Sequence, residues 1–113
     1  MRDETVARNY ADTLFDLARR HEGLEPFAEG IETVARLLDE DPRFRLFLET
    51  PRIADAEKKV VVRRVFGDVL PRQLLHFLLI TIDKRRQRLL RTIAREYAAL
   101  LDEHEGQSRL GAG

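Results

Sequence analysis

Hydrophobic residues recur along this chain at steps of three and four, which is the spacing that places side chains on one face of an α-helix. The clearest run puts five apolar residues on a single stripe: Leu24, Phe27, Ile31, Val34 and Leu38. No strand-length segment alternates apolar and polar residues, so we expect no β-strands. The pattern predicts an all-α protein.

Glycine and proline residues divide this pattern into six predicted helices. Gly23 and Gly67 stand where two periodic stretches stop, as residues just beyond a helix C-terminus often do. Pro42 and Pro71 stand where helices begin, and Asp41 directly before Pro42 is expected to be an N-cap. The expected helices cover about 3–21, 24–40, 42–50, 54–66, 71–85 and 88–104, and we expect them to form a six-helix bundle.

The helical pattern defines one expected domain, residues 1–105. The remaining segment, 106–113, has the sequence GQSRLGAG and is small, polar and rich in glycine. Such a composition is typical of a flexible linker stub or of a tail left by the expression design.

Two predicted helices have wider apolar arcs than a bundle core requires. A helix that only faces a core needs a stripe somewhat wider than about 100°. The first helix has a largely apolar arc of about 200°, with alanines in one half and Tyr10 and Leu17 in the other. In the fifth helix Phe77 and Ile80 lie outside a core stripe that is already complete; that stripe contains Leu74, Leu75, Leu78, Leu79 and Ile82.

The surplus apolar residues leave two explanations open. The fifth helix is either buried centrally in the bundle, or it has one face for the core and another for a partner. In both cases we expect Leu14 and Leu78 to be buried. If the second explanation holds, Tyr10 and Ile80 are partly exposed.

Charge and composition narrow the classes of function. Lys plus Arg and Asp plus Glu are each 20, so the net charge is zero and no global signature of nucleic-acid binding exists. Locally, the segment from Lys84 to Arg95 contains six cations and no acid. A small helical domain that binds nucleic acid through this patch is therefore an alternative hypothesis. A bundle that buries its extra face against its own copy is another.

Catalytic and ligand-binding motifs are missing from the sequence. The chain has three histidines and no cysteine, and it contains neither an HExxH metal motif nor a glycine-rich phosphate loop. We therefore expect no catalytic residues, no metal site and no cofactor. No apolar run approaches the roughly 20 residues that span a bilayer, so we expect no direct membrane insertion.

Three segments of the sequence are taken together because their residues, order and spacing match those of one protein family. In VARNYADTLFDLA the motif positions are Ala7, Arg8, Tyr10, Ala11, Leu14, Phe15 and Ala18. In IADAEKKVVVRRVFG they are Ile53, Glu57, Lys58, Phe66 and Gly67. With LLHFLLITIDKRRQRLLRTIAREYAALLDEHEG as the third segment, residues 3–106 resemble the N-terminal domain of ATP synthase delta subunits, the family of the oligomycin-sensitivity-conferring protein.

The resemblance implies a non-catalytic stator subunit of the rotary proton-translocating ATP synthase, peripheral to the complex on the cytoplasmic face of the bacterial plasma membrane. It implies a groove between the first and fifth helices that binds the N-terminal segment of an alpha subunit. By position, Tyr10, Thr13, Phe77 and Ile80 would line this groove, with Leu17 and Lys84 beside it. Delta subunits continue into a C-terminal region that binds the b subunits of the peripheral stalk, and we expect this chain to lack that region.

Overall fold

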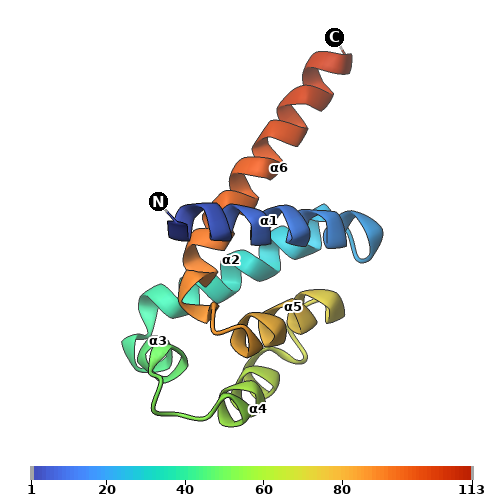
Figure 1. Ribbon diagram of the computed structural model, residues 1–113. Helices are drawn as coiled ribbons and strands as arrows, with labels where there is room; N and C mark the ends of the chain where they lie inside the picture. The colour runs from blue at the N-terminus through green and yellow to red at the C-terminus, as the bar shows by residue number, and fades with distance from the viewer. Residues whose placement is uncertain (1, 113) are drawn as a thin grey trace.

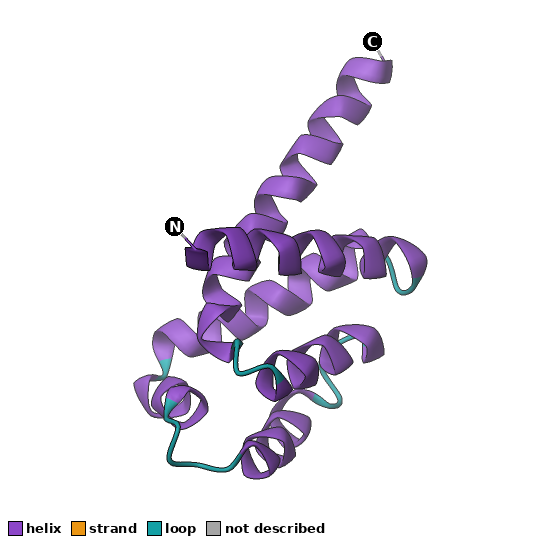
Figure 2. Cartoon of the chain, in the orientation of Figure 1, coloured by secondary structure: helices purple, strands orange, loops and turns teal. Residues whose placement is uncertain are grey.

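The computed structural model describes the backbone of residues 2–112 and the side chains of residues 2–106. The described backbone is helical, with short connections and no strand (Figures 1 and 2), which confirms the all-α six-helix prediction. The elements are α1 (Arg2–Arg20), α2 (Leu24–Glu40), α3 (Pro42–Glu49), α4 (Asp55–Phe66), α5 (Arg72–Asp83), the 3-10 helix η1 (Gln87–Leu89) and α6 (Leu90–Ala112).

Local capping explains where the first helices begin and end. The Asp41 carboxylate accepts hydrogen bonds from the backbone N–H groups of Arg43 and Phe44, both at 3.1 Å, and so caps α3 as the sequence predicts. After α1, Gly23 has a φ of +108°, a conformation that residues with a Cβ rarely adopt. Its N–H donates to the Ala18 carbonyl at 2.8 Å, which closes the helix.

The end of α5 uses an arginine where most helices use a glycine. Arg85 has a φ of +57°, in the left-handed region. Its N–H donates to the Ile82 carbonyl at 3.0 Å, and that of Arg86 donates to the Thr81 carbonyl at 2.7 Å. This pair of bonds is a Schellman motif. Because no glycine marks it in the sequence, the predicted helix ran two residues too far.

Helix α6 continues beyond its expected end near residue 104, and this boundary prediction was wrong. A glycine inside a helix costs about 1 kcal/mol relative to alanine, but it does not force the helix to end. Gly106 accordingly lies within α6. The C-terminal part of α6 projects beyond the other helices (Figure 1), and the longest axis of the molecule is 53 Å, against 34 and 24 Å for the others. The side chains of 107–113 lie outside the described part, so the linker assignment for 106–113 stays a prediction.

The core forms around α6, which packs against both α1 and α2. The alanine-rich face of α1 makes close contact possible: Ala7, Ala11, Leu14 and Ala18 are fully buried. Leu78 of α5 is also buried, so the expected burial of Leu14 and Leu78 is confirmed. Helix α4 packs on α5 at the other end of the molecule.

A buried glycine lets α2 approach the start of α5. A Cβ added at Gly30 would lie 2.4 Å from Leu74 Cδ2 and 3.2 Å from Leu70 Cδ2. Both distances are shorter than ordinary van der Waals contacts, so a side chain here would displace one of the two leucines. Gly30 is therefore a packing residue within α2.

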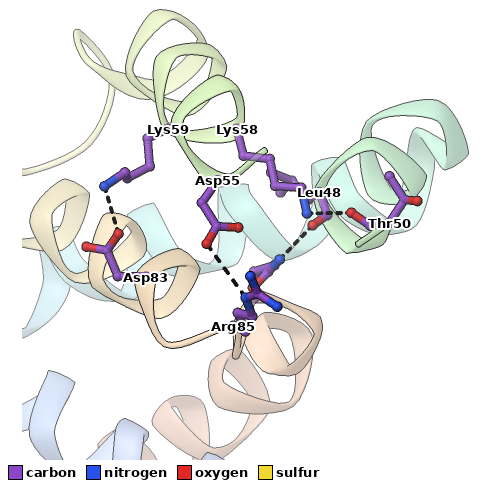
Figure 3. Close-up of polar contacts among 8 residues, drawn as sticks. Leu48, Thr50, Asp55, Lys58, Lys59, Asp83 and Arg85 are labelled. Carbon is purple, nitrogen blue, oxygen red and sulfur yellow. Dashed lines mark hydrogen bonds and ion pairs between the residues drawn. The ribbon is translucent and has the colours of Figure 1, made fainter. Parts of the chain in front are cut away.

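Two long polar side chains bind the C-terminal end of α3 (Figure 3). Lys58 of α4 is 1% exposed, and its Nζ donates to the Thr50 carbonyl at 2.6 Å. The buried Gln87 of η1 donates through Nε2 to the Leu48 carbonyl at 2.8 Å. The last carbonyls of a helix lack partners within the helix and carry negative partial charge, so a buried ammonium is stabilised there. These two bonds connect α3 to α4 and to η1.

Because of Tyr97 in α6, the free energy of unfolding should decrease at alkaline pH. Burial raises the pKa of its phenol to about 12, with a smaller contribution from the Glu25 carboxylate, and its hydroxyl donates to the Leu24 carbonyl at 2.7 Å. In the unfolded chain this phenol titrates near pH 10. Stability from the neutral phenol is therefore complete below about pH 10 and falls by roughly 2–3 kcal/mol as the pH rises through the folded pKa. Urea unfolding of wild type and Tyr97→Phe across this range measures the difference, and an equal loss in both proteins would contradict it.

Candidate functional site

The six residues predicted to bind a partner come from two neighbouring helices. Tyr10, Thr13 and Leu17 lie on α1, Phe77 and Ile80 on α5, and Lys84 is the C-cap of α5. Helices α1 and α5 contact each other in the structure. We refer to these six residues as the α1–α5 set.

Two aromatic residues of the α1–α5 set meet at the contact between the helices. The rings of Tyr10 and Phe77 have centroids 6.1 Å apart and planes at 82°, which is an edge-to-face arrangement. Such pairs add about 0.5–1.5 kcal/mol beyond their area burial. The pair therefore contributes to holding α1 against α5.

The exposed fractions separate the members of the set. Ile80 is 51% exposed and Tyr10 is half-buried, as the sequence predicts. Leu17 is also half-buried, while Thr13 and Lys84 are exposed. Phe77 differs from the others because only 4% of it is exposed. It thus lies beneath the surface.

Most of helix α5 fits the first of the two explanations that its apolar arc left open, central burial in the bundle. It is central along most of its circumference; its buried residues are Leu74, Phe77, Leu78, Leu79, Thr81 and Ile82. One exposed strip remains, with Arg72, His76, Ile80 and Asp83 at steps of three and four. Ile80 is the apolar residue of this strip, so an exposed isoleucine stands among polar neighbours.

Other kinds of site find no support in the described residues. No group of three or more histidine, aspartate or glutamate side chains in this part of the chain could hold a metal ion. Within the part of the chain that the structure describes, no helix is both long enough and apolar enough to cross a membrane.

The basic segment 84–95 uses part of its charge inside the fold. Arg88 donates to both carboxylate oxygens of Asp3, at 2.7 and 3.1 Å, and this contact lowers the pKa of that carboxyl. Arg91 donates to Asp39 at 3.0 Å. These bonds join η1 and α6 to α1 and α2. They favour an intramolecular role for the segment over nucleic-acid binding, and sequence reasoning missed them because the partners are 85 and 52 residues away.

Sequence reasoning also missed a hollow between α2 and α6. It has a volume of about 400 Å³ and includes Glu25, Glu29 and Glu32 in its lining. The signal was present in the sequence, because acids at steps of four and three share one edge of a helix. Their place beside a hollow depends on the packing of α6, which the helical pattern does not specify.

Known proteins similar to this chain share one description. The family model for the ATP synthase delta (OSCP) subunit matches residues 6–111. A protein of Gemmatimonas aurantiaca named ATP synthase subunit delta is 41% identical over 103 residues, which cover 91% of this chain and 56% of the relative. Proteins of the same name are 36% identical in Trichodesmium erythraeum (87% of this chain, 54% of the relative) and in Moorella thermoacetica (93% and 58%). The chain spans about half the length of the curated relatives it matches.

Proposed function

Because this chain belongs to the ATP synthase delta (OSCP) subunit family, we propose that it is a non-catalytic part of the stator of the rotary proton-translocating ATP synthase. A stator resists the torque that the rotor exerts on the catalytic head. Its contribution is binding free energy between subunits, and it requires neither a nucleophile nor a metal. A chain built from packed helices with an exposed apolar residue beside a helix contact is consistent with that role.

In the proposed complex, the N-terminal amphipathic segment of an alpha subunit lies along α1 and α5. The observation that best supports this placement is the exposure of Ile80, which is 51% exposed next to the contact between Tyr10 and Phe77. Leu17 would extend the apolar surface along α1, and the exposed Lys84 would meet an acid of the partner. Phe77 would support the surface from below, since it is already buried.

The expected affinity of this contact is moderate. Completing the burial of Tyr10, Leu17 and Ile80 contributes roughly 3–6 kcal/mol, and the apolar face of the alpha segment contributes a similar amount. Ordering a flexible segment removes about 2–5 kcal/mol. In the upper part of these ranges the balance is about 8 kcal/mol, which corresponds to a Kd near micromolar for the isolated segment.

The proposal places the chain at the cytoplasmic face of the bacterial plasma membrane, held there by its partners in the complex. The b subunits of the peripheral stalk would bind the region that the relatives possess beyond the matched half. Within this chain the proposal therefore concerns only the contact with the alpha subunit.

Titration with a synthetic peptide from the N-terminus of the matching alpha subunit tests this assignment. Calorimetry should show saturable binding near micromolar Kd, and amide shifts in NMR spectra should be confined to α1 and α5. A well-folded chain that produces no heat and no shifts with this peptide would rule out the proposed contact.

A further inference from the structure

The hollow between α2 and α6 has an apolar floor that combines alanines with larger side chains. Helices α2 and α6 pack against each other, and alanines at their contact leave a space of about 400 Å³. The apolar lining consists of Ala28 and Ile31 from α2 and of Ala94, Tyr97, Ala98 and Leu101 from α6. We call this feature the α2–α6 hollow.

Carboxylates line the edges of the α2–α6 hollow. Glu25, Glu29 and Glu32 line it from α2 and Asp102 lines it from α6, while Arg95 is the one cation in the lining. The four acids and one cation give this surface an excess of three negative charges in a chain whose net charge is zero.

Few of these carboxylates are neutralised within the fold. Glu32 accepts a hydrogen bond from Arg36, one turn along α2, at 3.0 Å. Between residues 2 and 106, the structure shows no ion pair for Glu25, Glu29 or Asp102. Arg95 donates to the Thr92 hydroxyl at 3.3 Å. The edges of the hollow thus offer carboxylates to a cationic ligand.

We propose that the α2–α6 hollow binds a basic amphipathic helix of a partner protein. An apolar floor between two helices accepts the apolar face of a third helix. Lysines or arginines on the flanks of that helix would meet Glu25 and Glu29 on one side and Asp102 on the other. The same carboxylates repel nucleic-acid phosphates and anionic lipid surfaces. No residue of the α1–α5 set lines the hollow, so this site is separate from the proposed alpha-subunit contact.

The first part of the test uses two synthetic helices of about 18 residues. One has leucines at helical spacing flanked by lysines, and its twin has glutamates in place of the lysines. Calorimetry with the 113-residue chain should show saturable binding of the lysine peptide and binding of the twin that is weaker by roughly tenfold or more. Amide shifts should centre on Ala28, Ala94 and Ala98. Raising the salt from about 50 to 300 mM should weaken binding.

Variants of the hollow complete the test. The double variant Glu25→Gln, Glu29→Gln should bind the lysine peptide about tenfold more weakly than wild type. The control double variant Glu57→Gln, Asp68→Asn removes the same charge from exposed sites elsewhere and should leave the affinity unchanged. Ala98→Trp fills the hollow from an exposed position and should abolish the shifts. Equal binding of both peptides, an equal loss in the control, or shifts on α1 and α5 instead would overturn the proposal. Concentration-dependent shifts of the same residues without any peptide would identify a second copy as the occupant and would overturn it as well.

Discussion

Leu78→Asp should abolish the folded state at room temperature. Leu78 is 1% exposed within the central part of α5, and Leu14 and Ile82 belong to the same buried cluster. An aspartate there either buries a charge without a partner or is protonated at a high cost, and it also removes the packing of the leucine. Each effect amounts to several kcal/mol, against a total stability of about 5–15 kcal/mol for a domain of this kind.

Circular dichroism and hydrogen exchange measure this effect directly. The matched control is His76→Asp, which introduces the same side chain two residues away on the exposed strip of α5 and should melt close to wild type. Native protection of the α5 amides in Leu78→Asp would show that the helix does not have the buried face described here.

Ile80→Glu should separate binding from folding. Because Ile80 is 51% exposed, a glutamate remains hydrated in the free protein, and the change should alter stability by less than about 0.5–1 kcal/mol. In the proposed complex, the same carboxylate would be forced against the apolar face of the alpha segment. That should cost several kcal/mol and remove detectable binding of the alpha-subunit peptide.

Three further variants make the outcome specific. Val69→Glu places the same side chain at an apolar site that is 63% exposed and should retain full peptide affinity. Arg91→Glu, in the basic segment, should stay within a few-fold of wild type. Tyr10→Glu should also abolish binding of the alpha-subunit peptide. Its melting temperature must be compared with that of wild type, because the Tyr10 ring packs on Phe77 and its loss also affects the fold. If Ile80→Glu binds normally while Arg91→Glu does not, the contact is electrostatic and lies elsewhere.

The sequence was sufficient for the helices because its local signals agree with the fold. Asp41 with Pro42, and Gly23 with a positive φ, are short-range devices whose geometry depends on a few neighbouring residues. Where the usual residue is missing, as at Arg85, the boundary was misplaced. Reliance on local signals also explains the wrong C-terminal boundary predicted for α6, because Gly106 resembles a helix end in the sequence but lies within the helix.

The candidate site was harder to predict from the sequence than the helices were, because it depends on how the helices pack against one another. The wide apolar arc of α5 left central burial and a partner face both open, and the expected exposure of Ile80 is observed. The arc could not show that Phe77 would be covered, since this required the position of α1. Likewise, Lys58 matches a family motif, but its bond to the end of α3 depends on a turn between two helices.

The pairing of α1 with α6 has a consequence for how the chain is made. The two helices lie at opposite ends of the sequence, yet the rings of Phe15 and Tyr97 pack with centroids 5.6 Å apart, and Arg8 reaches Glu96 at 3.2 Å. A ribosome therefore releases α1 before the residues of α6 have been made, and the apolar face of α1 stays uncovered until α6 emerges. Such contacts close a long loop and form late in folding. The nascent chain should thus present α1 to chaperones until α6 has emerged, and the cooperative fold should appear only once α6 is free to dock.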